Sequence, residues 1–153
     1  MKKIFCCLLM AVMLSACGGE NKKSESSKKR VGDIVMVDGE FGVVFAVTTD
    51  GQHGKAMSVS QTECSWGNAK HWCANFGQGW RLPTEDELRV IYGNKTIINS
   101  ALRTNGYTTL TNSFHWSSEF AGGHYACGFD MDCGLSIVNI RFNELCVRAV
   151  SAF

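Results

Sequence analysis

The stretch GQGWRLPTEDELRVIYGN, residues 77–94, contains the only proline of the chain, Pro83. Thr84, with Glu87 three residues later, fits the capping box, in which each side chain accepts a hydrogen bond from the other residue's backbone N–H. The three positions after Thr84 are all acidic, which suits the positive end of a helix dipole. The stretch therefore predicts a short helix starting after Thr84, with Pro83 fixing the angle at which the chain enters it.

Helical spacing continues on both sides of this stretch. Upstream, a single apolar face recurs in the segment SWGNAKHWCANFG, with Ser65 available as N-cap and Gly77 as the stop; its members are Trp66, Ala69, Cys73 and Phe76. Downstream, residues 96–106 predict one or two further helical turns that Gly106 ends. We expect two or three short helices between residues 65 and 106.

Strands are predicted before and after these helices. The runs DIVMV (33–37) and FGVVFAVTT (41–49) flank Asp38-Gly39, a strong hairpin signal, and KAMSVS (55–60) follows as the third strand of a meander. After the helices come FHWSSEF, HYACGF, LSIVNIRF and LCVRAVSAF, short strand-like runs joined by loops that contain Gly and Asp. Strands, then helices, then strands again indicate an α+β domain.

The amino terminus has the pattern of an export signal. Two lysines precede an apolar run from Ile4 to Leu14, which is too short to span a membrane. The following Leu-Ser-Ala-Cys, ending at Cys17, resembles the bacterial lipobox, which implies cleavage after residue 16 and acylation of Cys17. Acyl chains on Cys17 would anchor the protein to a membrane, since each buried methylene contributes about 0.8 kcal/mol. A generic signal peptide that happens to end in cysteine is the alternative.

Residues 17–30 form the predicted tether between this anchor and the domain. Residues 18–30 have no apolar side chain and carry five basic and two acidic residues, so they are expected to be solvated and disordered. Gly18 after the cysteine favours the outer membrane by analogy with enteric lipoproteins, on either the periplasmic or the cell-surface side. Residues 31–153 suffice for one domain. That domain carries eight basic and twelve acidic residues and no basic patch, which argues against nucleic acid.

Three motifs in the domain together resemble a known group of proteins. GWRLPTEDEL, HWSSE and the terminal VRAVSAF follow one another over residues 40–153, after a helix with Trp, Ala and Cys on one face. They are similar to the C-type-lectin-like domains of bacterial surface proteins, of the Legionella collagen-like adhesin C-terminal and Fibrobacter major paralogous types. The resemblance implies helices on a curved antiparallel sheet, the last strand paired with the first, and Trp80, Trp116, Val147 and Val150 in the core.

The same resemblance implies that the protein binds a ligand, because loops on a rigid sheet carry recognition in this fold. We expect a protein or glycan to be recognised by the 119–134 region and by neighbouring residues of 137–143. The candidate ligand-binding residues are Glu119, His124, Tyr125, Phe129, Asp130, Asp132, Asn139, Arg141 and Asn143. A solvated loop without a ligand is the alternative for this region.

Calcium-dependent sugar binding is not expected. The chain lacks the Glu-Pro-Asn or Gln-Pro-Asp triplet and the Trp-Asn-Asp stretch of lectins that bind sugar through calcium. Glu119, Asp130 and Asp132 could supply oxygen ligands, but they lack the regular spacing of a calcium loop. We expect no metal and no cofactor.

Five cysteines fall in the domain: Cys64, Cys73, Cys127, Cys133 and Cys146. Export allows disulfides, and an odd number leaves at least one thiol unpaired. The fold resemblance suggests a Cys73–Cys146 bridge, while Cys127 and Cys133 flank GFDMD and could form a second bridge; sequence alone leaves the connectivity open.

Two sharper chemical hypotheses compete with these pairings. His115, His124, Cys127 and Cys133 could hold zinc, although their spacing is not that of a zinc finger. RLPTEDEL and CVRAV also resemble the formylglycine-generating enzymes, which share the fold and use a cysteine pair with copper, but the chain is far shorter than those enzymes. No nucleophile motif of hydrolases is present, so we expect no enzyme. The prediction is a cell-envelope lipoprotein with a C-type-lectin-like domain for adhesion or ligand recognition, and the alternative is a structural envelope component.

Overall fold

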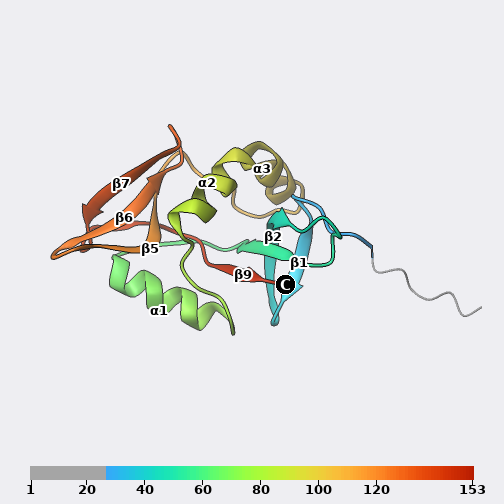
Figure 1. The fold of residues 1–153 in the computed structure, drawn as a ribbon, viewed down its shortest axis with the longest axis horizontal. Helices are drawn as coiled ribbons and strands as arrows, with labels where there is room; N and C mark the ends of the chain where they lie inside the picture. Colours follow the sequence, from blue (N-terminus) through green and yellow to red (C-terminus); the bar gives the residue numbers. More distant parts are fainter. Residues whose placement is uncertain (1–26) are drawn as a thin grey trace, which may run out of the picture.

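The computed structural model describes residues 27–153, which form three helices and nine strands in two sheets (Figure 1). The amino-terminal strands are β1 (Ile34–Val37), β2 (Glu40–Val47), β3 (Gly54–Ser58) and β4 (Thr62–Cys64). The helices are α1 (Trp66–Phe76), α2 (Glu85–Gly93) and α3 (Lys95–Thr104). The remaining strands are β5 (Phe114–Gly122), β6 (Tyr125–Asp130), β7 (Leu135–Ile140), β8 (Leu145–Val147) and β9 (Val150–Ala152). The predicted signal and Cys17 lie outside the described residues.

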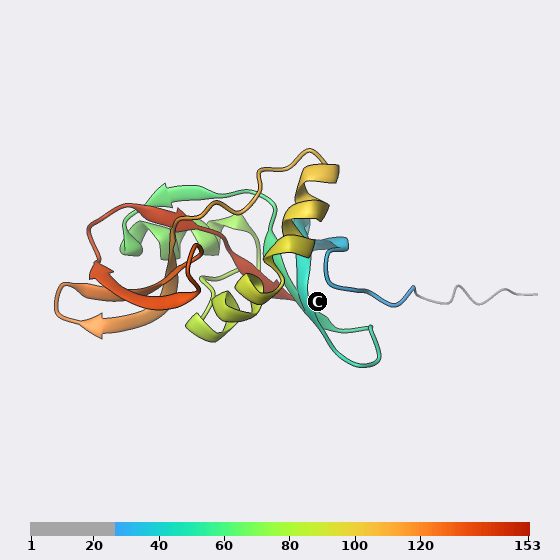
Figure 2. The ribbon, with the colours of Figure 1, turned by 90° about the horizontal axis from the view of Figure 1, so that it is seen from above.

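The two sheets occupy opposite ends of the domain (Figures 1 and 2). One has the order β1-β2-β3-β9, and the other has the order β4-β8-β5-β6-β7. All strand pairs are antiparallel except β5 with β8, where His115 pairs with Cys146 in parallel. The predicted α+β class and the three-stranded meander β1–β3 agree with this arrangement.

Two apolar clusters lie on opposite sides of the strands, since alternate strand residues point to opposite faces. On one side Val44 and Trp116 pack with the apolar face of α1. On the other side Phe45 and Phe129 pack with Leu88 of α2, and α3 joins the same cluster. The helices therefore sandwich the strands, with α1 beneath and α2 and α3 above in Figure 1.

The expected core residues at the motifs are buried. Trp80, Trp116, Val147 and Val150 are each at most 3 % exposed. The expected pairing of the last strand with the first is wrong: β9 pairs with β3, through Met57 and Val150 among others. The run 145–153, expected as one strand, is two strands in different sheets, separated by Arg148 and Ala149.

Helix α1 begins where the sequence predicts, but Ser65 does not cap it with its side chain. Helix α3 is longer than the one or two turns expected, spanning ten residues, and Gly106 follows it with a φ of 75°. Among residues 27–153, no helix has the length and apolar character needed to cross a membrane. The last residues of the predicted tether lie against the domain, because the Lys29 N–H donates to the Gly51 carbonyl at 2.8 Å.

Candidate functional site

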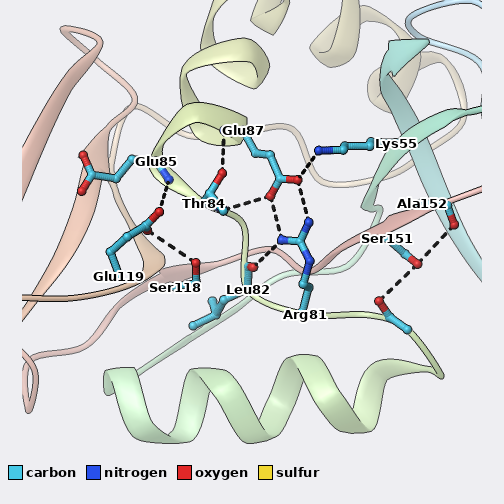
Figure 3. Close-up of polar contacts among 11 residues, drawn as sticks. Lys55, Arg81, Leu82, Thr84, Glu85, Glu87, Ser118, Glu119, Ser151 and Ala152 are labelled. Carbon is cyan, nitrogen blue, oxygen red and sulfur yellow. Dashed lines mark hydrogen bonds and ion pairs between the residues drawn. The ribbon is translucent and has the colours of Figure 1, made fainter. Parts of the chain in front are cut away.

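The motif RLPTEDEL forms a charged network beneath the first turn of α2 (Figure 3). The Glu87 carboxylate accepts hydrogen bonds from the Arg81 guanidinium at 2.7 and 2.8 Å and from Lys55 Nζ at 2.8 Å. It also accepts from the Thr84 N–H at 2.9 Å, while the Thr84 hydroxyl accepts from the Glu87 N–H at 3.1 Å. The predicted capping box is confirmed. One buried carboxylate therefore joins α2, β3 and the segment before the helix.

This network is a structural clamp rather than a binding site. Burial would raise the pKa of Glu87, but the hydrogen bonds from Arg81, Lys55 and the Thr84 N–H outweigh burial and lower it to about 2. The Arg81 backbone also pairs with Val150, through N–H to carbonyl distances of 2.8 and 3.0 Å. The Glu87 carboxylate and the Arg81 guanidinium are thus both engaged within the chain.

Beside the clamp lies a groove of about 730 Å³ that was not predicted from the sequence. Its walls are mostly apolar, and Lys55, Thr84 and Glu87 lie at its polar side. The groove forms between the β2–β3 hairpin, α2 and the carboxyl-terminal Phe153, which are far apart in the sequence. No local pattern signals it, because its walls meet only after the two sheets and α2 have packed.

The predicted ligand-binding residues are not gathered in one place. The region 119–134 was expected to be a loop, but most of it is the hairpin of β5 and β6. His124, Asn139, Arg141 and Asn143 lie at one end of β6 and β7, where Asn143 donates to Asn139 at 2.8 Å. Asp130 and Asp132 lie at the other end, and a six-residue strand separates the two groups by about 20 Å.

Two further members of the predicted set have structural roles. Phe129 is fully buried between the sheet and α2, with its ring 5.9 Å from that of Tyr92, so its prediction as a ligand-binding residue is wrong. Its place in β6 puts it on the face that α2 covers. Glu119 accepts a hydrogen bond from the Glu85 N–H at 3.2 Å and so helps to satisfy the start of α2 (Figure 3).

Aromatic and cationic side chains gather at the β5–β6 turn. Phe120 stacks on Trp66 with ring centroids 5.7 Å apart, and Lys70 Nζ lies 3.6 Å from the centre of that indole on α1. The Phe142 ring lies 5.8 Å from His124 and 5.1 Å from the Arg141 guanidinium carbon. We call Phe120, His124 and Phe142 the aromatic end of the domain. Phe120 and Phe142 are 53 % and 62 % exposed.

Other exposed apolar residues lie on both faces of the sheet formed by β5, β6 and β7. Of the eleven large hydrophobic residues that are exposed among residues 27–153, seven lie between positions 114 and 142. They are Phe114, Phe120, Tyr125, Leu135, Val138, Ile140 and Phe142. Of these seven, only Tyr125 is among the ligand-binding residues predicted from the sequence. The sequence of β7, LSIVNI, mixes apolar residues with Ser136 and Asn139 without strict alternation, so periodicity does not show which of its residues are exposed.

The acidic turn after β6 is organised by local hydrogen bonds. Asp130 accepts from the Asp132 N–H at 2.7 Å and from the Cys133 thiol at 3.1 Å, and the first of these contacts is an Asx-type turn. The thiol contact, followed by the backbone contact, lowers the pKa of Asp130. Glu119 is not part of this turn, and residues 27–153 hold no group of three or more potential metal ligands.

The five cysteines of the domain are free thiols, so the proposed Cys73–Cys146 and Cys127–Cys133 bridges are absent from the structure. Cys73 lies on the face of α1 that packs into the core, where burial raises its pKa to about 12. Cys146 points to the opposite face of β8 from its neighbours Leu145 and Val147, and its sulfur contacts Glu63 at 3.4 Å. The sheet therefore separates these two thiols.

The other pair of thiols is also separated. Cys127 lies in the middle of β6 opposite Val138, where burial, and then Glu85, raises its pKa to about 11. Cys133 lies beyond the end of the strand and contacts Asp130. The arrangement does not form the copper-binding pair of the oxidase hypothesis.

The zinc hypothesis fails on the same geometry. His115 is 1 % exposed in β5, and burial lowers its pKa to about 4, whereas His124 lies at the exposed β5–β6 turn. The two histidines and the two cysteines of the proposed zinc site are therefore not brought together.

Comparison with known proteins gives little beyond the architecture. No protein-family model matches the chain, and no curated protein matches it. Botrocetin is among the solved structures that resemble it, with 16 % sequence identity and a TM-score of 0.41, over 63 % of this chain and 90 % of botrocetin. Three helices with two largely antiparallel sheets are compatible with a C-type-lectin-like fold. At this TM-score the likeness carries no argument about function.

Proposed function

We propose that this protein is a recognition module of the cell envelope that binds another protein through its aromatic end. The observation that carries the proposal is the exposure of Phe120 and Phe142, each packed on one side by a fixed neighbour. Aromatic residues and arginine are enriched at protein interfaces. Aromatic side chains in particular bury much surface at a low cost in conformational entropy. Here the rings are already held in place by Trp66, His124 and Arg141.

The supporting side chains make the aromatic end rigid. Trp66 is buried, and its indole N–H donates to the Ser117 carbonyl at 2.8 Å, which fixes the ring on which Phe120 stacks. The Trp66 backbone N–H donates to the Arg141 carbonyl at 3.0 Å, which ties α1 to the segment after β7. Trp66 therefore presents Phe120 to a partner in a defined orientation, which lowers the entropy cost of ordering that ring on binding.

The membrane part of the proposal rests on the sequence. Acylation of Cys17 would anchor the chain in the outer membrane, and residues 18–30 would hold the domain away from the bilayer. The proposed role is non-enzymatic. The clamp at Glu87 has all its groups engaged, and the thiols and histidines of the enzyme and zinc hypotheses lie apart.

Site-specific photo-crosslinking in intact cells tests this role. A photoreactive phenylalanine analogue in place of Phe142 is expected to give an adduct with another protein. The matched control is the same analogue in place of Phe41, which is 44 % exposed on β2 in the other sheet. Alanine at Phe120 should weaken the adduct formed from position 142. Equal adducts from positions 41 and 142, or an adduct unaffected by Phe120→Ala, would contradict the proposal.

A further inference from the structure

Strand β7 is an exposed sheet edge without the usual protection. It is the last strand in the order β4-β8-β5-β6-β7, and Leu135–Ile140 contains no charged residue and no proline. Leu135 and Val138 are each 63 % exposed, on opposite faces of the strand. Natural edge strands are normally shortened, charged, bulged or covered, because unpaired backbone groups recruit another strand. An uncharged sequence without proline, such as that of β7, is typical of a strand that is paired with another strand on both sides.

The backbone of β7 shows which groups are free to pair. The Arg141 N–H points toward β6 and donates to the His124 carbonyl at 2.9 Å, whereas the Ile140 N–H donates to the Asn139 side chain at 2.8 Å. Since direction alternates along a strand, Ser136 and Val138 point outward with Ile140. The Ile140 carbonyl accepts from the Asn143 N–H at 2.9 Å. Within residues 27–153, this leaves the outward N–H and C=O groups of Ser136 and Val138 unpaired.

The two ends of β7 carry opposite charges. Asp130 is the last residue of β6 and Asp132 lies in the turn before β7, while Arg141 follows the last residue of β7, beside His124. Arg141 makes no ion pair among the described residues, and neither does Asp132. A strand that is acidic at its beginning and basic at its end is complementary in charge to an antiparallel copy of itself. This charge complementarity indicates that the strand pairing with β7 is β7 of a second copy of this chain.

We propose that β7 pairs with β7 of a second copy of this chain, antiparallel and around a two-fold axis at Ile137. The free backbone groups determine this register: Ser136 of each copy faces Val138 of the other, so that all four outward groups of each strand are used. The symmetry is that of an isologous interface, in which the same surface serves both partners. The result is one continuous sheet through both domains.

The register also satisfies the charges and the side chains. Because the axis passes through Ile137, residues equally far before and after it lie opposite each other in the two copies. Arg141 of each copy therefore lies at the acidic turn of the other, which makes two charge contacts per dimer. Val138 and Ile140 lie on the same face as Tyr125, their neighbour on β6, so the apolar strips of both copies become continuous. The Asn139–Ile140 hydrogen bond remains intact, because the pairing ends before it.

Sedimentation equilibrium of the full chain in detergent micelles tests the pairing. Val138→Pro removes one outward N–H, and proline is tolerated on an edge strand where the N–H faces solvent. Val138→Thr is the matched control, because it keeps the N–H and the branched side chain. We expect the wild type and the threonine variant to dimerise, and the proline variant to dimerise at least about tenfold more weakly, since it loses a backbone bond at two symmetric positions.

Charge reversal gives a second, independent measurement. Asp132→Arg and Arg141→Asp should each weaken the dimer, and the double variant should restore it, because the two positions meet across the axis. A chain that stays monomeric up to about 1 mM overturns the proposal, as does a dimer that survives Val138→Pro or a double variant that fails to recover. A strand of a different protein on β7 would leave the purified chain monomeric and would also overturn it. In the proposed dimer position 142 faces Asp132 of the second copy, so an adduct between two copies of this chain reports on the β7 pairing. Only an adduct with a different protein reports on the recognition role, and the mass of the adduct therefore lets the two proposals fail separately.

Discussion

Replacing Glu87 with glutamine removes one negative charge from the clamp beneath α2 and keeps the shape of the side chain. Glu87 is 6 % exposed, and it accepts hydrogen bonds from Arg81, Lys55 and the Thr84 backbone. Burial opposes ionisation, but these contacts lower the pKa of Glu87 from 4.5 to about 2. One pKa unit corresponds to about 1.4 kcal/mol, so folding favours the ionised form by roughly 3 kcal/mol.

Solvent screening reduces this figure, because the side chains of Arg81 and Lys55 are about half exposed. We therefore expect Glu87→Gln to lower the free energy of unfolding by about 2 kcal/mol at neutral pH. A carboxyl whose pKa is depressed in the folded state stabilises the protein in full above its unfolded pKa. That stabilisation is lost as the pH falls from 4.5 toward 2. The difference in free energy of unfolding between the wild type and Glu87→Gln should thus become smaller as the pH falls over this range.

Urea unfolding, followed at neutral pH and at steps down to pH about 3, measures both effects. Asp86→Asn is the matched control, since Asp86 is also acidic and in the first turn of α2 but pairs with Arg89 on the exposed surface. The control should cost at most about 0.5 kcal/mol. A Glu87→Gln variant that loses no more than the control, or whose loss does not change with pH, would refute the clamp. Helix α2 itself should persist, because glutamine can still complete a capping box.

Three further changes test other parts of the fold. Arg148 is buried, and its guanidinium donates to four oxygens of the chain, so Arg148→Met should cost about 3 kcal/mol or more in urea unfolding and Arg148→Lys should recover less than half. Gly134 and Gly106 both have positive φ, but only at Gly134 would an added Cβ lie 2.5 Å from the Tyr92 ring. In urea unfolding, Gly106→Ala should lower the free energy of unfolding by about 1 kcal/mol, and Gly134→Ala by at least twice that. Cys73, whose pKa burial raises to about 12, should resist thiol reagents until the chain unfolds, and peptide mass spectrometry that finds it labelled in the native protein would contradict its place in the core.

The elements that the sequence predicted well are those whose signals are local. The capping box at Thr84 and Glu87 needs only four consecutive residues, and it forms as expected. The hairpin at Asp38-Gly39 is likewise local, and both residues have positive φ. The partner of β9 is not a local property: Val150 suits any strand with an apolar face, and packing of the whole sheet places it beside β3.

Side-chain direction explains the errors at the candidate site. Cys73 and Cys146 are both buried, as a bridged pair would be, but the parity of β8 sends Cys146 to the face away from α1. Phe129 lies in a segment rich in polar loop residues, yet its position in β6 aims it at α2. A shift of one residue along a strand reverses the face of every side chain, and the sequence of this region does not determine that register.

Strand β7 also separates two groups of the predicted ligand-binding residues. The fold resemblance implied that Asp132 and Arg141 belong to one ligand-binding surface, but β7 extends between them and holds them apart. Within one chain they cannot meet while β7 remains a strand. An antiparallel second copy brings the acidic turn of each chain to the arginine of the other, and it does so through the only backbone groups of β7 that have no partner among residues 27–153. The charges at the ends of β7 are therefore better explained as contacts between two copies than as one ligand site within a single copy.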